Sequence, residues 1–238
     1  MMQKTMSKWP KTPPPLSPAQ LQAREAFMRL WHEQLPKKYA LIEQFNHSYV
    51  AKLPHKTGSI TLEVGAGLGE HSKFENLQDQ DYYNLEYREE FCNTLRETFS
   101  KDRVHCGDIQ KTQPWPDETF DRIVSVHVLE HLPDLPSALK EISRLLKKQG
   151  CFDLVIPTEG TPAYSLARKI SSERFFTKRF KMDYDPIIKN EHINTFEEIM
   201  ELLPHFFKIE QQKFFPIPLP IPQVNLCAGF RLLKNGKT

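Results

Sequence analysis

Three glycines at alternate positions, directly after a short apolar run, constrain the fold of this chain more than any other feature. The chain has nine glycines in 238 residues, and three of them, Gly65, Gly67 and Gly69, follow a run that is typical of a buried strand. Glycine lets the backbone turn sharply, adopt a positive φ and approach a ligand with no Cβ atom in the way. A strand that ends in such a turn and leads into a helix places the free N–H groups of the helix beside a bound molecule. The pattern therefore predicts a ligand site at the end of this strand.

The glycine spacing distinguishes two kinds of nucleotide ligand. A dinucleotide-binding turn has the pattern G-x-G-x-x-G, in which the third glycine packs the helix on the strand. Here the pattern is G-x-G-x-G, and Glu70 stands where that third glycine would fall. Glu63, two residues before the first glycine, offers an acidic group for an ammonium ion, which a pyrophosphate ligand lacks. We therefore expect a ligand other than a dinucleotide.

Acidic residues also end the next two predicted strands. Glu86 follows Gly69 by 17 residues, and a carboxylate at this position can accept hydrogen bonds from both hydroxyls of a ribose. Asp108 can accept a hydrogen bond from an exocyclic amine such as that of adenine, and Ile109 can pack against the ring. The alternative interpretations are an ordinary exposed charge at Glu86 and a turn-forming aspartate at Asp108. Their register with the glycine turn favours recognition of a nucleoside.

Alternating strand and helix signals after the glycine turn predict an α/β fold with a mostly parallel sheet and helices on both faces. Two strand-like runs near the C-terminus have no helical pattern between them, so we expect them to form an antiparallel hairpin at the sheet edge. The predicted strands are 60–64, 82–86, 103–106, 120–126, 150–156, 206–215 and 224–233. The predicted helices are 69–77, 88–100, 134–148, which Gly150 is expected to end, and 195–203.

Length and charge indicate one domain without a general nucleic-acid-binding surface. A chain of this length suits a single α/β domain with additional elements, and its net charge of +2 is nearly balanced. We expect the Lys- and Pro-rich residues 1–17 to be extended or disordered, and residues 18–238 to form the domain. The expected parts of the domain are N-terminal helices (18–55), a ligand-binding core (56–158), a substrate cap (159–195), and a C-terminal helix with the strand hairpin (196–238).

The cysteines and the N-terminus bear on the compartment. The four cysteines, Cys92, Cys106, Cys151 and Cys227, form no C-x-x-C pair, so we expect neither structural zinc nor a disulfide framework. We expect no other metal site. The N-terminus has no apolar core typical of a signal peptide, and no window approaches the roughly 18 apolar residues of a membrane span. We therefore expect a reducing, cytoplasmic setting.

The motifs together resemble a known enzyme family. E-x-G-x-G-x-G at the glycine turn is similar to the first motif of class I S-adenosylmethionine-dependent methyltransferases. Residues 115–132, the helix that follows and the strand FDLVIP resemble the fourth-strand and fifth-strand region of the small-molecule (type 11-like) members, which include quinone, sterol and sugar methyltransferases. The resemblance covers about residues 58–160 and, more loosely, residues 192–196. It implies a Rossmann-like seven-stranded fold and S-adenosyl-L-methionine as cofactor, but it names no substrate.

The resemblance also implies roles for individual residues. Glu86 would bind the ribose hydroxyls, Asp108 and Ile109 the adenine, and His127 would line the site near the sulfonium. The residues expected to contact the methionine portion of the cofactor are Glu63, Gly65, Ala66, Gly67 and Gly69.

Histidines are the leading candidates for contact with the methyl acceptor. An imidazole suits proton transfer because its pKa is near neutral, and His127, His131 and His192 are the candidates for a general base. Glu159 and Tyr164 are further pocket-lining candidates. Each histidine has an alternative interpretation as a hydrogen-bonded structural residue. We favour His192 as the residue that contacts the acceptor, because its position resembles the substrate-side histidine of the family.

A basic and aromatic segment, residues 168–181, follows the fifth predicted strand, where related enzymes insert a substrate cap. It carries six Lys and Arg residues and three phenylalanines against a single acidic residue. Such a mixture can bind an anionic headgroup or contact an acidic membrane surface peripherally. We therefore expect a small-molecule, glycan or lipid-linked acceptor, with an anionic one favoured by this basic segment and with O-methylation favoured. The alternative is a solvated helix whose phenylalanines pack inward.

Three other functions are weighed against this interpretation. A nucleic-acid methyltransferase of this fold often has Asn/Asp-Pro-Pro-aromatic after the fourth strand, but Ser125-Val126-His127-Val128 stands there, so we expect no nucleic-acid partner. The glycine spacing and the lack of a Tyr-x-x-x-Lys pair argue against an NAD-dependent oxidoreductase. A non-catalytic partner protein on the same fold stays open, and cofactor binding would distinguish it.

Overall fold

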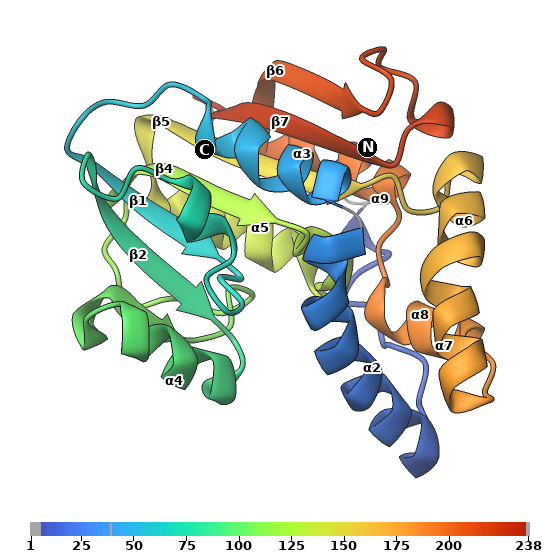
Figure 1. The fold of residues 1–238 in the computed structure, drawn as a ribbon. Coiled ribbons are helices and arrows are strands. Elements are labelled where there is room, and N and C mark those ends of the chain that lie inside the picture. Colours follow the sequence, from blue (N-terminus) through green and yellow to red (C-terminus); the bar gives the residue numbers. More distant parts are fainter. Residues whose placement is uncertain (1–5, 39, 237–238) are drawn as a thin grey trace.

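The computed structural model describes residues 6–38 and 40–236, with the backbone alone for residues 31–38. Within these residues a seven-stranded sheet has the order β3-β2-β1-β4-β5-β7-β6 (Figure 1). The first five strands are parallel, and β7 is antiparallel to both β5 and β6. The predicted fold class and the antiparallel hairpin at the edge are thus confirmed. The strands are β1 (Ser59–Val64), β2 (Gln80–Glu86), β3 (Val104–Cys106), β4 (Phe120–Val126), β5 (Leu146–Pro157), β6 (Phe207–Phe215) and β7 (Cys227–Lys234).

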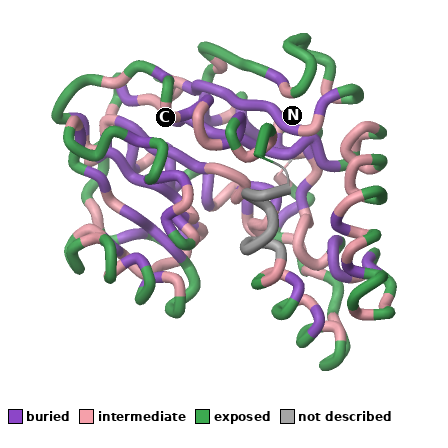
Figure 2. Tube along the Cα trace, viewed as in Figure 1, coloured by how far each residue is buried: buried purple, intermediate pink, exposed green. Residues whose placement is uncertain are grey.

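Helices cover both faces of the sheet. The α3 helix packs on one face with Phe45, Tyr49 and Val50, and α5 and α9 pack on the other face in the main hydrophobic core. Figure 2 shows the central strands buried between these layers, while the edge strand β6 and the outer sides of the helices are exposed. The helices are α2 (Pro18–Lys38), α3 (Ala40–Ala51), α4 (Glu89–Thr98), α5 (Leu135–Leu145), α6 (Pro162–Arg168), α7 (Arg174–Phe180), α8 (Asp185–Glu191) and α9 (Phe196–Phe206).

A buried ion network joins α3 to the sheet. Arg122 donates to Glu75 at 2.9 Å, to Asp153 at 2.8 Å and to the carbonyl oxygen of Val50 at 2.9 Å. Arg231 donates to both carboxylate oxygens of Asp153, each at 2.8 Å. We call Glu75, Arg122, Asp153 and Arg231 the arginine network. It fixes β4, β5 and β7 relative to the end of α3, near the amino-terminal half of β4.

The helix predicted over residues 69–77 is wrong, because only a 3₁₀ turn, η1 (His71–Phe74), forms there. His71 is buried and hydrogen-bonds Glu75 at 2.9 Å, and Glu75 in turn pairs with Arg122. The pair between Glu75 and Arg122 holds the segment on the sheet, so a regular helix does not follow the glycine turn. The N–H groups of residues 65–69 all donate within the protein, so the turn leaves no unpaired N–H group for a ligand.

Of the other predicted helices, α4 agrees to within two residues, α9 runs three residues beyond its predicted end, and α5 is shorter than predicted. That helix ends at Leu145, three residues before the predicted end, and β5 begins at once. Gly150 therefore lies inside a strand instead of capping the helix. A Cβ atom at Gly150 would lie 2.9 Å from the carbonyl oxygen of Asp121, so close approach of β4 explains this glycine.

The α2 helix packs against the cap rather than on the sheet. Ser17 and Gln20 form reciprocal side-chain to backbone hydrogen bonds that begin α2, of the capping-box kind. Phe27 of α2 contacts Phe176 and Tyr184, from α7 and the start of α8, with ring centroids 5.4 and 5.6 Å apart. Residues 11–17 have neither helix nor strand, and residues 1–5 of the predicted tail lie outside the described residues.

One expectation about cysteine is wrong. Cys92 of α4 and Cys106 at the end of β3 form a disulfide, with Cα atoms 5.9 Å apart. The two cysteines are 14 residues apart, a spacing that predicts no disulfide. They meet because the chain crosses over from α4 to β3. Cys151 and Cys227 are free thiols. Among the described residues, no helix combines the length and apolar character needed to cross a bilayer.

Candidate functional site

The glycine turn after β1 requires glycine on steric grounds. Gly65, Gly67 and Gly69 have φ values of +73°, +57° and +79°, which are unfavourable for other residues. The N–H groups of Gly65 and Ala66 donate to the carbonyl oxygen of Leu85 at 2.8 and 3.2 Å. A Cβ atom at Gly65 would lie 2.4 Å from a methyl carbon of Val128, so the turn also packs against the loop after β4. The predicted turn is therefore the meeting point of β1, β2 and β4.

Glu86 lies where the sequence predicts a ribose-binding carboxylate. It is the last residue of β2 and is 4% exposed. One carboxylate oxygen accepts from the N–H of Gly67 at 3.0 Å, and the other accepts from the N–H of Arg88 at 2.9 Å. These bonds hold the carboxylate beside the glycine turn. Arg88 Nε also donates to the second oxygen at 3.4 Å, so the oxygen that accepts from Gly67 retains a lone pair for a ligand hydroxyl.

Glu63 is oriented differently from the expected ammonium-binding group. It is 3% exposed, and the hydroxyl of Tyr82 donates to its carboxyl group at 2.8 Å. Burial raises the pKa of Glu63 to about 8, against the lowering effect of the Tyr82 hydrogen bond. The carboxyl is therefore neutral at pH 7 in the free protein. An approaching ammonium ion would favour its ionised form, because an opposite charge lowers a carboxyl pKa.

The two predicted adenine contacts differ in accessibility. Asp108 lies in the turn after β3, where it accepts from the backbone and side-chain nitrogens of Gln110 at 3.0 and 2.9 Å. It is partly exposed and can accept a further hydrogen bond. Ile109 is 4% exposed and packs in the main core with Val64 and Leu85. Ile109 therefore shapes the floor of this region and offers almost no surface to a ring.

A turn directly after β4 carries the first three residues of a polar cluster. The N–H of His127 donates to the carbonyl oxygen of Val155 at 2.9 Å, and its φ of +54° turns the chain away from the sheet. The short turn η3 (Leu129–His131) follows. His127 Nδ1 lies 3.3 Å from a carboxylate oxygen of Glu130, and His131 Nε2 lies 3.8 Å from the same oxygen.

Backbone and side-chain hydrogen bonds bring residues 191–195 against this turn. The N–H groups of Ile193 and Asn194 both donate to the carbonyl oxygen of Glu130, at 2.9 and 3.0 Å. The buried Asn194 amide donates to the carbonyl oxygens of Leu129 and Leu132 at 2.9 and 2.8 Å, and its oxygen accepts from the indole of Trp9 at 2.9 Å. The N-terminal tail is thus held in place by the same asparagine.

These bonds place His192 beside His131, with ring centroids 4.8 Å apart. His192 Nδ1 hydrogen-bonds Glu159 at 2.7 Å, and Glu159 also accepts from Arg168 of α6 at 2.6 Å. Burial alone would raise the pKa of Glu159, but His192 and Arg168 lower it. Tyr164 lies further off, its ring centroid 6.4 Å from that of His192. We call His127, Glu130, His131, Glu159 and His192 the histidine cluster.

Glu130 is the residue of the cluster that sequence reasoning missed. Its side chain is 1% exposed, and burial alone would raise its pKa, yet the hydrogen bond from His127 and the nearby imidazoles lower that pKa to about 2. Among the residues that the structure describes, its Oε2 atom has no hydrogen-bond partner, and neither has Nε2 of His127. A buried ionised carboxylate with one unpaired oxygen is costly, which marks the cluster as a site.

The basic segment of residues 168–181 divides into two sides. Phe176 is fully buried and Phe175 and Phe180 are partly buried against α2 and Tyr184, so the phenylalanines pack inward. The basic side chains are exposed except for Arg168, and Leu166 and Ile170 are 61% and 68% exposed beside them. The phenylalanines therefore pack as the alternative interpretation expects, whereas the basic outer side is accessible, and binding of an anionic acceptor stays a prediction.

Comparison with known proteins places the core in a family. Residues 62–153 match the family model described as a methyltransferase domain. An uncharacterized protein of Methanocaldococcus jannaschii is 31% identical over 163 residues, which cover 66% of this chain and 65% of that protein. Sterol 24-C-methyltransferase of Schizosaccharomyces pombe is 28% identical over 117 residues, 47% of this chain and 31% of that protein. This chain thus spans between about one third and two thirds of the length of these relatives.

Solved structures agree in fold. Geranyl diphosphate C-methyltransferase of Streptomyces coelicolor superposes with a TM-score of 0.62 at 10% identity, over 93% of this chain and all of that chain. A possible histamine N-methyltransferase of Thermotoga maritima gives 0.59 at 20% identity, over 90% and 99%. The chain therefore shares the fold of these enzymes, and its residues 62–153 match a methyltransferase domain. S-adenosylmethionine is the cofactor of this domain, as the resemblance implied.

The residues present fit this cofactor. The Val128 side chain occupies the space beside Gly65, so glycine at this position lets the left-handed turn pack closely on the loop after β4. Glu86 and Asp108 stand along the same edge, at the ends of β2 and β3, with acceptor oxygens for a ribose and an adenine amine. His127, at the end of β4, connects this edge to the histidine cluster.

Proposed function

We propose that the chain methylates an oxygen atom of a small-molecule, glycan or lipid-linked acceptor. The observation that carries the proposal is the adjacency of two groups of residues at one edge of the sheet. The glycine turn and Glu86 end β1 and β2, and the histidine cluster begins directly after β4. Because ligands of open α/β sheets bind at the carboxyl ends of the strands, a cofactor at the first group adjoins an acceptor at the second.

The main task of the protein in this reaction is to position the acceptor against the methyl group. S-adenosylmethionine, when bound, supplies a methyl group that is already activated. The chain's residues hold the acceptor in line, which can contribute about 7–11 kcal/mol. They also take the acceptor's proton, a smaller contribution of about 10²–10⁴-fold in rate. His127, His131 and His192 are the residues that we propose contact the acceptor, with Glu159 and Glu130 orienting their rings.

The outer side of the cap supports an anionic or lipid-linked acceptor. Exposed Leu166 and Ile170 lie on the same helical segment as exposed basic residues, a combination that suits an acidic membrane surface. The names of two similar proteins, a sterol methyltransferase and geranyl diphosphate C-methyltransferase, refer to isoprenoid acceptors. Those names also make C-methylation of a lipid the second candidate function.

The proposal is tested by release of S-adenosylhomocysteine across a panel of sugar, phenol, quinone, lipid and alkene acceptors. We expect turnover with a hydroxyl acceptor, loss of turnover in Glu86→Ala, and weaker binding of anionic acceptors as salt rises. Turnover only with an alkene would replace O-methylation by C-methylation. Binding of the cofactor with no turnover on any acceptor, RNA and DNA included, would indicate a non-catalytic partner protein.

A further inference from the structure

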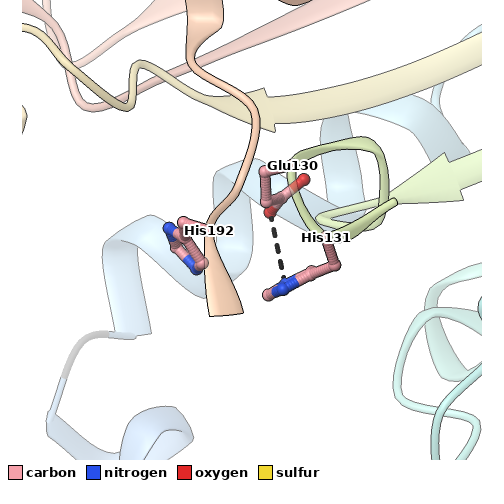
Figure 3. A group of neighbouring side chains, drawn as sticks. All are labelled: Glu130, His131 and His192. Carbon is pink, nitrogen blue, oxygen red and sulfur yellow. Dashed lines mark ion pairs between the residues drawn. The ribbon is translucent and has the colours of Figure 1, made fainter. Parts of the chain in front are cut away.

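We infer that Glu130, His131 and His192 bind a divalent first-row transition-metal ion. One ligand atom from each of these residues lies within 4.8 Å of the others. Figure 3 shows the three side chains gathered at one place, Glu130 and His131 from the turn after β4 and His192 from the segment after α8. The sequence gives no metal-binding pattern here, because His192 is distant along the chain and joins the pair only through folding.

The hydrogen bonds of His131 and His192 occupy Nδ1 of each ring and leave Nε2 available to bind a metal. His131 Nδ1 lies 2.7 Å from the carbonyl oxygen of Glu191, which only accepts, so Nδ1 carries the proton and Nε2 has the lone pair. His192 Nδ1 lies 2.7 Å from the Glu159 carboxylate, which orders that ring in the same way. A metal-binding histidine almost always donates its second N–H to a carbonyl or a carboxylate. Both of these outer contacts are already present.

Glu130 supplies an independent indication of a missing cation. Its side chain is 1% exposed, and among the described residues its Oε2 atom has no hydrogen-bond partner. Leaving such an oxygen unpaired costs free energy that a bound cation would remove. The carbonyl oxygen of Glu130 accepts from two backbone N–H groups, which hold the residue in place, and Oε1 contacts His127 Nδ1, so Oε2 is the oxygen left for a cation.

The spacing and the donor types indicate the class of ion. Ligands about 2.1 Å from a tetrahedral ion lie about 3.4 Å apart, and His131 Nε2 is 3.8 Å from a Glu130 oxygen, so a small inward movement suffices. Two imidazoles with one carboxylate suit zinc and its first-row neighbours, whereas magnesium and calcium prefer oxygen ligands alone. Three protein ligands leave coordination positions open for oxygen atoms of a substrate.

The open coordination positions also narrow the chemical class of the acceptor, an inference that rests on the proposed function. An ion beside His127 lies between the cofactor edge and the cap, where two adjacent hydroxyl oxygens of one acceptor can bind it. His131 and His192 then reach the acceptor through the ion, and His127 is left to take the proton. We therefore expect catechols or vicinal diols to be methylated faster than matched acceptors with one hydroxyl.

The metal site is tested with the full chain after dialysis against a chelator. Titration with Co²⁺ should give a visible absorption band that saturates at one ion per chain, and Zn²⁺ should displace it. His131→Gln, His192→Gln and Glu130→Gln should each weaken binding by at least about 10-fold, because loss of even an outer partner costs about 10–100-fold. Glu130→Gln is isosteric and keeps the backbone contacts, so it separates loss of a ligand from loss of fold.

The matched control is His205→Gln. His205 lies in the last turn of α9, about 15 Å along that helix from the segment that carries His192, and should leave Co²⁺ binding unchanged. Absence of saturable binding, or equal binding by Glu130→Gln and His192→Gln, would overturn the inference. Co²⁺ binding without methyl transfer would support the site and contradict the proposed function. Methyl transfer without Co²⁺ binding would support the proposed function and overturn the metal site.

Discussion

The arginine network and the histidine cluster bury charge in opposite ways. In the arginine network every nitrogen donor group of Arg122 has a partner, and both oxygens of Asp153 accept from an arginine. In the histidine cluster Glu130 is equally buried, but one of its oxygens has no partner among the described residues. The first lies in the amino-terminal half of β4, and the second begins one residue beyond the end of that strand.

The difference indicates what each cluster does. Complete pairing of buried charges holds elements together, and here it joins α3, β4, β5 and β7. Incomplete pairing is retained where a ligand completes the set, which is typical of functional sites. Glu63 is a third case, because its buried carboxyl holds a proton and therefore carries no charge that needs a partner. The four predictions below test these assignments, from the largest expected effect to the smallest.

Removing Arg122 should have the largest effect on stability. Arg122→Met leaves Glu75 and Asp153 buried with lost partners, which should lower the free energy of unfolding by about 3–5 kcal/mol. Urea denaturation followed by circular dichroism measures it. Lys189→Met, which removes an exposed pair with Asp185, should cost less than about 1 kcal/mol. Equal losses in the two variants would mean that the arginine network does not stabilise the fold.

Removing the His192 imidazole should affect turnover instead. His192→Ala should lower kcat by about 10²-fold or more, because an acceptor-side contact or a proton-transfer group is lost. The dissociation constant for S-adenosylmethionine should stay nearly unchanged, since Glu86 and the glycine turn are untouched. Steady-state kinetics and calorimetry measure the two quantities. A large loss of cofactor binding would refute the acceptor-side role.

Glu63 should give the protein a pH-dependent stability. Its folded pKa of about 8 lies above the ordinary value of 4.5, so between these values the folded state holds a proton that the unfolded state releases. Stability should therefore fall as pH rises through this window, with a slope of up to about 1.4 kcal/mol per pH unit. Glu63→Gln keeps an acceptor for Tyr82 and should remove this contribution. Urea denaturation from pH 5 to pH 9 measures the free energy of unfolding of both proteins. An equal change with pH in the two proteins would contradict the assignment.

Glu130→Gln should have the smallest effect on stability. The substitution keeps the side-chain volume but removes a charge that the nearby imidazoles stabilise, so the free energy of unfolding should fall by about 1–2 kcal/mol, less than in Arg122→Met. Thermal denaturation in the presence of a chelator measures it, beside Arg122→Met. A loss as large as that of Arg122→Met would show that Glu130 is structural.

Sequence patterns predicted those features that depend on near neighbours. The strands followed from apolar runs, and the glycine turn with Glu86 followed from the spacing between the ends of β1 and β2. The 3₁₀ turn at His71 was missed because it depends on Arg122, 51 residues away along the chain. Likewise, Glu130 gave no signal, since its partners His131 and His192 meet only when Asn194 bonds the turn after β4. The disulfide between Cys92 and Cys106 depends on the packing of α4 against β3.

Binding of S-adenosylmethionine tests the central claim most directly. Isothermal titration should give one site per chain for the natural sequence, an unchanged affinity for His192→Ala, and strongly weakened binding for Glu86→Ala, whose carboxylate holds the glycine turn and faces the ribose position. That outcome would assign the β1–β2 edge to the cofactor and the histidine cluster to the acceptor. Failure of the natural sequence to bind the cofactor, or equal binding by Glu86→Ala, would contradict the account.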